Sequence, residues 1–315
     1  MDNLTHSLAG WALGQTGLKR KTRKGLAALV LGANMPDIDV FFGWVPWEPL
    51  ATHRGFTHGL VGGVLLMPPL LAALLWLLDR WQQRRGAEFR SGLAMHFGWL
   101  LALSYIGTLS HPLLDWQTTY SVQLLSPISD LWFHHDALFI IDVWVWMMLA
   151  GAIWLSRRRE LQDRDWQRPA LAGLALVIVY IGANGLLSAS GKDTVRARSS
   201  RPPEAIYASP LPVLFWRREL AWRSDGMMTW GLYDALAPGR LGAVTTPLPD
   251  NLADPLVRQA LAAPGLKTFA RWSTMPIAQV DRGKCSARVN FGDARYGRAA
   301  AGNRLGDSVE VPLPC

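Results

Sequence analysis

The strongest constraint on this chain is a set of long segments without formal charge. Gly59–Leu78, Ser91–Leu114 and Pro169–Gly191 contain no Asp, Glu, Lys or Arg. Each is long enough to cross a hydrocarbon layer of about 30 Å as a helix of about 20 residues. A fourth segment, Ala137–Ser156, carries only Asp142. At least four membrane spans are therefore predicted.

Two shorter apolar segments, Asn3–Leu18 and Gly25–Phe42, come before these spans. They are too short or too broken to cross a membrane, so we expect partial or tilted helices packed against the others. Half of the chain is hydrophobic and 18% is charged, against about 25% charged in soluble domains. The predicted fold class is mainly α: a polytopic membrane helix bundle of about six helical segments.

The loops between these segments differ sharply in charge. Lys19–Lys24, Asp79–Arg90 and Arg157–Arg168 together hold 14 Lys and Arg, whereas Gly43–Phe56 and Trp116–His135 together hold one. Because Lys- and Arg-rich loops stay in the cytoplasm, we expect a multi-pass membrane protein with the basic loops inside. The net charge of +8 is then explained by topology, and no nucleic-acid partner is expected.

The chain changes character after about residue 191. Residues 1–191 are predicted to form the membrane domain, and residues 192–315 a small α+β domain, soluble and extracytoplasmic. Val213–Trp222 and Lys284–Phe291 alternate as strands do, and Asn251–Ala262 has the pattern of an amphipathic helix. Cys285 and Cys315 both lie here. They fit one disulfide and leave no cysteine for a metal site elsewhere.

Acidic and histidine motifs cluster beside the apolar segments. There are five: Asp2–His6, Asp37–Asp39, His53–His58, His111–Asp115 and Asp136–Asp142. Ionisable groups at membrane depth are costly and usually functional. With the basic loops on the cytoplasmic side, all five motifs fall at the opposite, outer end of the bundle. The loop charges and the motif positions are independent observations, so their agreement predicts one shared site.

The residue types in these motifs are metal ligands. His111 and Asp115 are four apart and so share a helix face, while Asp37 and Asp39 follow a proline that ends a helix. Mixed imidazole and carboxylate ligands favour Zn²⁺, with Mn²⁺ or Fe possible, and their number suggests two ions. The candidate ligands are His6, Asp37, Asp39, His53, His58, His111 and Asp115.

Three residues are candidate catalytic groups. Asp37 is either ligand or general base. Arg54 lies between two candidate ligands, and its guanidinium suits a phosphate. Asp142, or Asp136, could orient a histidine or carry a proton. Purely structural roles stay open for many of the candidates. These are helix capping or a hydrogen-bonded pair for His111 and Asp115, a turn for Asp37 and Asp39, an interface role for His53 and His58, snorkelling for Arg54, and loop positions for His134 and His135.

In this order, the motifs resemble the membrane-bound metal-dependent hydrolase family, the YdjM-like proteins, also described as LexA-binding and associated with the inner membrane. The matching pieces are MDNLTH, PDID, HRGFTH, HPLLDWQTTY, the stretch from Ser126 to Asp142, and the later PLPVLFWR and FGDARYG. The resemblance implies a divalent-metal hydrolase site at Asp37, Asp39, His53, His58, His111 and Asp115. It also implies a protein of the bacterial inner membrane, and with the basic loops inside, the site and the C-terminal domain are expected on the periplasmic side. A LexA partner is not expected, because the predicted topology places the tail outside.

The motifs also look like a more distant group, the zinc-dependent phospholipase C and nuclease fold. We therefore expect a membrane-embedded hydrolase that uses a metal-activated water on the phosphoester of a lipid or amphiphile. The alternative from another class is a metal-ion transporter or sensor with an intramembrane His/Asp site. An intramembrane protease is disfavoured, since the sequence lacks His-Glu-x-x-His and Gly-x-Ser-x-Gly.

Overall fold

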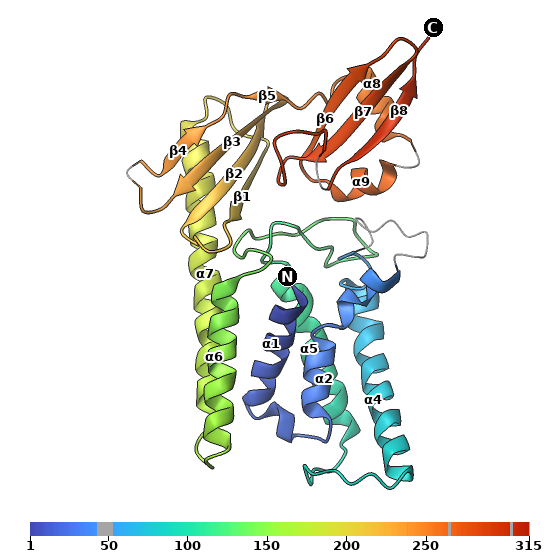
Figure 1. Cartoon of the computed structure of the whole chain (residues 1–315), viewed down its shortest axis with the longest axis vertical. Helices are drawn as coiled ribbons and strands as arrows, with labels where there is room; N and C mark the ends of the chain where they lie inside the picture. Colours follow the sequence, from blue (N-terminus) through green and yellow to red (C-terminus); the bar gives the residue numbers. More distant parts are fainter. Residues whose placement is uncertain (43–52, 238, 264–265, 303–304, 315) are drawn as a thin grey trace. The chain divides into compact units, whose positions relative to one another are not determined.

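The computed structural model describes residues 1–42, 53–237, 239–263, 266–302 and 305–314. The chain forms two compact units, one of residues 1–42 and 53–183 and one of the described residues from 184 onward. The first is helical and the second contains the β-sheets (Figure 1). The division falls inside one long helix, between Ala183 and Asn184, and the sequence predicts a boundary a few residues later, at 191.

The helical unit begins with short elements and continues with longer helices. In chain order the elements are α1 (Asn3–Gln15), the 3₁₀ turn η1 (Leu18–Arg20), α2 (Gly25–Gly32), the 3₁₀ segment η2 (Met35–Phe42), the π-helix η3 (Leu60–Leu66), α4 (Met67–Arg84), α5 (Phe97–Asp115), α6 (Val143–Glu160) and α7 (Gln167–Arg198). The predicted partial helices are thus α1 and the pair α2 and η2. Pro68 and Pro69 begin α4, where the π-helix gives way to an α-helix.

Three helices in the described part of the chain are long and apolar enough to cross a membrane. They are Leu60–Arg84, Phe97–Asp115 and Gln167–Arg198. A fourth span is not confirmed. The segment from Ala137 contains α6, but this helix starts only at Val143 and ends in Arg157, Arg158, Arg159 and Glu160. Its uncharged part, Val143–Ser156, rises only about 21 Å.

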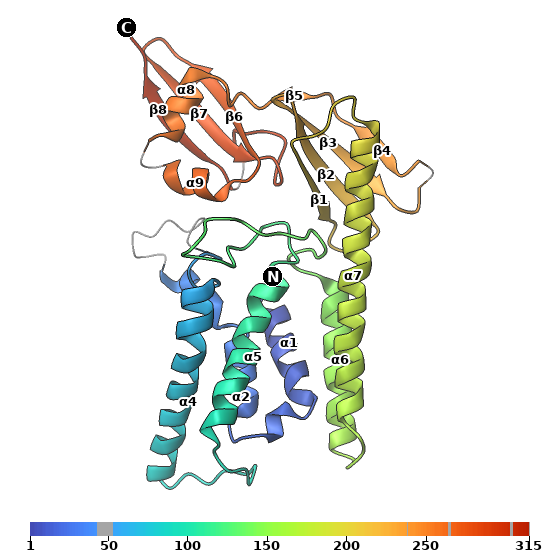
Figure 2. The same cartoon turned by 180° about the vertical axis from the view of Figure 1, so that it is seen from behind.

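Two apolar clusters hold the helices of this unit together. Buried residues of α1, α6 and α7, such as Ala12, Leu149 and Val177, form one cluster. Residues of α2, α4 and α5, such as Leu29, Leu75 and Leu103, form the other. The basic loops lie at one end of the bundle, and the end of α5 and the start of α6 lie at the other (Figures 1 and 2).

Ion pairs fasten the basic loops to the helices. The guanidinium of Arg23 meets Asp79 of α4 through two hydrogen bonds, Nε to Oδ1 at 2.7 Å and Nη2 to Oδ2 at 2.8 Å. Glu160, at the end of α6, accepts from Lys19 at 2.6 Å and from Arg20 at 3.2 Å. Asp79 is fully buried, so Arg23 neutralises a charge inside the bundle.

The second unit contains two antiparallel sheets, which fit the predicted small α+β domain. The first has the order β1 (Ala205–Pro210), β2 (Arg217–Ser224), β3 (Met227–Asp234) and β4 (Leu241–Val244), with β5 (Leu248–Pro249) also pairing with β3. The second has the order β6 (Pro276–Arg282), β7 (Ser286–Asp293) and β8 (Asp307–Pro312). Two short helices, α8 (Pro255–Leu261) and α9 (Lys267–Trp272), precede β6.

Both predicted strand runs lie close to observed strands, β2 and β7. The helix expected over Asn251–Ala262 is shorter, because Asp254 caps it and Pro255 begins it. Buried Arg218 of β2 fastens the sheet to the second half of α7, donating to Asn184 Oδ1 at 2.8 Å and Ser188 Oγ at 2.8 Å. Cys285 is disulfide-bonded, and its predicted partner Cys315 lies outside the described residues.

Candidate metal centre

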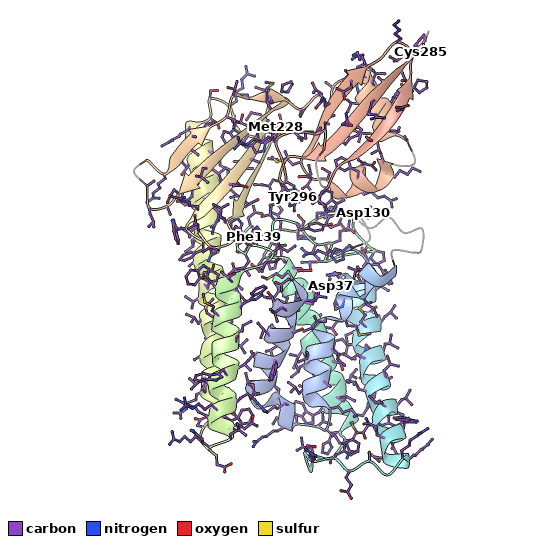
Figure 3. The ribbon with its side chains drawn as sticks, in the orientation of Figure 1. Asp37, Asp130, Phe139, Met228, Cys285 and Tyr296 are labelled. Carbon is purple, nitrogen blue, oxygen red and sulfur yellow. The ribbon has the colours of Figure 1, made fainter. Side chains whose placement is uncertain are left out.

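Four elements bring the predicted ligands to one end of the helical unit. Asp37 and Asp39 lie on η2, and His53 and His58 lie on the turn that leads into η3. His111 and Asp115 close the last turns of α5, and His6 lies on α1. Figure 3 shows Asp37 at the end of the helical unit where α5 finishes. This is the convergence that the loop charges predict.

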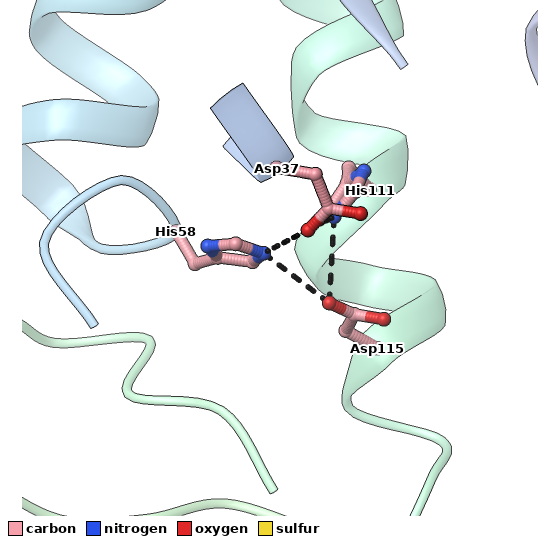
Figure 4. Close-up of side chains that lie close together, drawn as sticks. All are labelled: Asp37, His58, His111 and Asp115. Atoms are coloured by element: carbon pink, nitrogen blue, oxygen red, sulfur yellow. Dashed lines mark hydrogen bonds and ion pairs between the residues drawn. The ribbon is translucent and has the colours of Figure 1, made fainter. Parts of the chain in front are cut away.

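Four of these residues form a tight, buried group: Asp37, His58, His111 and Asp115. Their side-chain atoms alternate nitrogen and oxygen around a closed ring (Figure 4). Asp37 Oδ1 lies 3.2 Å from His111 Nε2 and 3.4 Å from His58 Nε2, and Asp115 Oδ2 lies 3.4 Å and 3.3 Å from the same two nitrogens. Tetrahedral ligands 2.0–2.1 Å from one ion are separated by about 3.3 Å, so these spacings fit a metal.

The hydrogen bonds of the histidines leave their Nε2 atoms available. His111 Nδ1 lies 2.6 Å from the carbonyl oxygen of Ala33 and must donate to it. His58 Nδ1 lies 3.0 Å from Thr57 Oγ1, whose hydroxyl donates to Asp39 Oδ2 at 2.7 Å. Among the described residues, His58 Nε2 and Asp115 Oδ2 are buried without a hydrogen-bond partner. Buried polar atoms rarely stay unpaired, and a fixed Nδ1 donor is typical of metal-binding histidines.

The electrostatics of the centre also suit a cation. Burial lowers the pKa of His58 to about 3, so its imidazole is neutral, the form that binds metals. The carboxylates of Asp37 and Asp115 face the two Nε2 atoms and supply oxygen ligands. The centre therefore combines imidazole nitrogens with carboxylate oxygens. It could hold a metal ion whose identity the geometry leaves open.

A second group of possible ligands shares Asp37 with the first: Asp37, Asp39 and His53. His53 Nδ1 lies 3.0 Å from Asp39 Oδ1, and His53 Nε2 lies 4.0 Å from Asp37 Oδ1. Both oxygens of Asp39 already have partners, His53 and Thr57. His53 is 26% exposed, whereas the four residues of the first group are at most 8% exposed. His53 therefore lies at the accessible side of the centre.

Comparison with protein-family models matches residues 1–190 to the family described as YdjM inner membrane protein. The chain belongs to this family. No curated protein and no solved structure matches it. All the candidate ligands lie within the matched residues, whereas the β-sheet unit falls almost entirely outside the YdjM region.

In this YdjM-family chain, His6 lies beside the ligand group but not within it. Its ring stacks on that of His111, and its Nε2 lies 3.5 Å from Asp115 Oδ1. Both ring nitrogens of His6 are buried and have no hydrogen-bond partner among the described residues. The amino group of Met1 also contacts Asp115. The predicted ligand His6 thus has a place next to the YdjM centre.

Arg54 is not placed as the sequence suggests. A guanidinium that binds phosphate should be open to a ligand, but Arg54 is 2% exposed and contacts Asp115 at 3.1 Å. It donates to Thr118 Oγ1 at 2.9 Å and lies over the ring of Tyr120. Its backbone has a φ of 64°. In this YdjM protein Arg54 therefore holds Asp115 in position.

Asp142, the predicted proton carrier, caps a helix. It is the N-cap of α6, and its carboxylate accepts from the backbone N–H of Trp144 and Val145. Tyr180 donates to it at 3.3 Å, and burial raises its pKa. Asp136, the other candidate, contacts His134 at 2.9 Å. Neither aspartate belongs to the two groups of possible ligands found in the described part of this YdjM chain.

Several residues of the YdjM centre were missed or misassigned from the sequence. Thr57 donates to Asp39, and Gly59 is the N-cap of the next helix. Thr118 and Tyr120, which pack on Arg54, lie in the HPLLDWQTTY motif without having been singled out. The carbonyl of Ala33 has no side-chain signature, so no sequence pattern could have found it.

Proposed function

We propose that this YdjM-family chain is a membrane-embedded, metal-dependent hydrolase acting on a phosphoester of a lipid or another amphiphile. The observation that carries the proposal is the buried ring of Asp37, His58, His111 and Asp115, in which nitrogen and oxygen atoms alternate at 3.2–3.4 Å. A divalent ion held there would supply Lewis-acid chemistry and an activated water at neutral pH. Zn²⁺ is the favoured ion for these ligands, with Mn²⁺ or Fe as alternatives.

The residues around the ring position its members. Arg54 and the backbone of α5 hold Asp115, and the carbonyl of Ala33 fixes the tautomer of His111. His53 is the most exposed residue of the centre, and Asp39 orients it with Nε2 directed at the shared Asp37. This arrangement supports binding of a substrate from the His53 side, and it supports a second ion that shares Asp37 with the first.

The amphiphilic substrate is inferred from the surroundings of the centre. α5, which provides His111 and Asp115, is a candidate membrane span, so the centre lies at the end of an apolar helix. The opposite end of the bundle carries the basic loops. With those loops in the cytoplasm, the centre would face the periplasmic leaflet of the inner membrane, where phospholipid headgroups are the most abundant phosphoesters.

Metal analysis of the full chain in detergent tests the first part of the proposal. We expect one to two transition-metal ions per chain, and a loss of the ions in Asp37→Asn and His58→Ala. His96→Ala is a matched control, because His96 is exposed and lies at the start of α5. Protein that carries no metal after gentle purification, or variants that keep it fully, would contradict a metal centre.

Incubation with a bacterial lipid extract tests the second part. Mass spectrometry should show phospholipids consumed by the wild type and unchanged with Asp37→Asn. The alternative function, a metal transporter, predicts metal uptake into proteoliposomes with no lipid turned over. Both groups of possible ligands found among the described residues share Asp37 and so lie at one end of the bundle, whereas transport across the membrane needs a path through both halves. This geometry favours the hydrolase.

A further inference from the structure

The outward face of α4 carries a shallow groove at the basic end of the bundle. Trp76, Leu77, Arg80, Trp81 and Arg84 line it, and its volume is about 520 Å³, within the range of small-molecule sites. These residues recur at helical spacing, so they share one face of α4. The opposite face carries Leu71, Ala72, Leu75 and Asp79, which are buried in the bundle.

Two positive charges in this groove are not neutralised by the protein. Within the residues that the structure describes, neither Arg80 nor Arg84 has an acidic partner at ion-pair distance. The nearest carboxylate on the helix, Asp79, faces inward, where Arg23 contacts it at 2.7 Å and Gln83 donates to it at 2.7 Å. Arg80 packs over the ring of Trp76 at 5.1 Å. The groove therefore presents cationic groups on an aromatic surface.

Some basic residues at the same end are paired with acidic groups. Lys19 and Arg20 share the carboxylate of Glu160, and Arg157 lies 3.6 Å from it. Arg23 is paired with Asp79. Arg80 and Arg84 have no such partner among the described residues, so their charges are available to an anion from outside the protein.

We propose that this groove binds the headgroup of an anionic phospholipid in the leaflet at the basic end of the bundle. Basic residues near an anionic leaflet attract its headgroups, and Trp side chains prefer this depth of the membrane. The helix continues toward the bilayer centre as an exposed row of apolar side chains, Leu70, Leu74, Leu77 and Leu78. A phospholipid placed with its phosphate between Arg80 and Arg84 can lay its acyl chains along this row.

The occupant is a lipid rather than a soluble phosphate, because the groove joins charged and apolar surface along one helix. The site is separate from the metal centre, which lies at the other end of the bundle, and it does not rest on the proposed hydrolase activity. A second copy of the chain, packed through Trp76 and Trp81, is the competing occupant.

Native mass spectrometry of the full chain tests the lipid site. The wild type, released from detergent with phosphatidylglycerol or phosphatidylcholine added, should retain phosphatidylglycerol preferentially. The double variant Arg80→Gln/Arg84→Gln should bind phosphatidylglycerol roughly tenfold more weakly. The reason is that each Arg near an anionic headgroup contributes to the electrostatic attraction, and the variant removes both. The matched control is Arg158→Gln/Arg164→Gln, which removes the same charge from exposed positions and should bind like the wild type.

Three outcomes would overturn the proposal. One is equal retention of the two lipids by the wild type. Another is equal weakening in the α4 variant and the control, which would reduce the effect to net charge. The third is a change from dimer to monomer in the α4 variant with lipid retention unaltered, which would assign the groove to a second copy. Metal content, measured on the same samples, should be unchanged in both variants and confirms that they are folded.

Discussion

The imidazole of His6 lies flat on that of His111, with ring centroids 3.6 Å apart and 14° between the ring planes. The contact joins α1 to the end of α5 directly beneath the candidate ligands. It leaves His6 close to Asp115 but outside the ring of four. His111 therefore belongs to the group of possible ligands, whereas His6 packs against that group.

This arrangement separates the two histidines experimentally. His6→Phe keeps a flat ring against His111 and removes the nitrogens near Asp115. We expect metal affinity to fall by about 10–100-fold, the usual effect of changing a residue behind a ligand, whereas His111→Ala should abolish binding. Titration with Zn²⁺ in competition with a chelator measures both. If His6→Phe loses metal as completely as His111→Ala, His6 is itself a ligand.

Asp39 should be separable from the four-residue ring. Asp39→Asn weakens the hydrogen bonds that Asp39 accepts from His53 and Thr57. His53, the most exposed histidine of the centre, then loses its fixed orientation. We expect the ring to keep one ion while any second ion and the lipid-hydrolysing activity are lost. Metal stoichiometry and turnover on the same preparation measure this. Thr57→Ser keeps the hydroxyl and should behave like the wild type; full activity in Asp39→Asn would refute the assigned role of Asp39.

Asp142 should affect stability rather than the metal centre. Asp142→Ala removes the N-cap of α6 and should destabilise the protein by about 1 kcal/mol, because two backbone N–H groups lose their acceptor. Asp142→Ser retains a capping oxygen and should recover most of this loss. Thermal unfolding in detergent measures the stability. Metal analysis measures the metal content, which should be the same as in the wild type. Loss of activity at unchanged stability would instead support proton transfer.

The close packing of α2 on α5 should be needed for the metal centre. A Cβ at Gly107 would lie 2.6 Å from the carbonyl oxygen of Leu29, so Gly107→Ala must push the two helices apart. His111 lies one turn further along and takes its tautomer from Ala33 of the α2 end. We expect Gly107→Ala to lower both thermal stability and metal affinity. Gly98→Ala is the matched control on the same helix, because nothing lies within 4 Å of its Cβ position.

The β-sheet unit should have an acid-sensitive ion pair. Burial alone would raise the pKa of Asp293, but the Arg295 guanidinium, 2.8 Å away, holds the pKa below its usual value. A lowered pKa stabilises the fold above the unfolded value of about 3.9, and this contribution disappears as the pH falls through the folded pKa. Breaking one side of a buried pair costs about 3–5 kcal/mol.

Asp293→Asn should therefore destabilise the protein most at neutral pH, and its difference from the wild type should shrink below about pH 4. Thermal unfolding of the full chain, followed through tryptophan fluorescence between pH 7 and pH 3, checks this. Trp272 is a suitable reporter, because Arg295 lies over its ring at 4.9 Å. A difference that stays constant over this pH range would show that the pair does not titrate as described.

The position of the centre was predictable because two physical rules act independently. Uncharged length determines which segments are helices of the membrane, and loop charge determines which ends lie together. Applied in turn, they bring His6, Asp37, His58, His111 and Asp115 to one end of the bundle, where the structure has them. The YdjM-family motifs lead to the same residues.

The contacts within the centre were not predictable, because they depend on the direction of individual side chains. Arg54 lies buried against Asp115. Thr57 donates to Asp39, while the N-cap of the next helix is Gly59, two residues later. Asp142 did have a recognisable signature, an aspartate directly before an apolar run, which marks a helix N-terminus. Because it lies in an otherwise uncharged segment, Asp142 was interpreted as a functional residue inside a membrane span. The predicted fourth span was therefore longer than the observed helix α6.

The bond between Arg23 and Asp79 has a consequence for how the chain is made. An aspartate within an apolar helix resists transfer into lipid, and α4 carries one near its end. Its counter-charge is on a loop that the ribosome completes more than fifty residues earlier. Arg23 is therefore synthesised before Asp79. Its guanidinium can neutralise the carboxylate while α4 enters the membrane, which lowers the free-energy cost of inserting this helix.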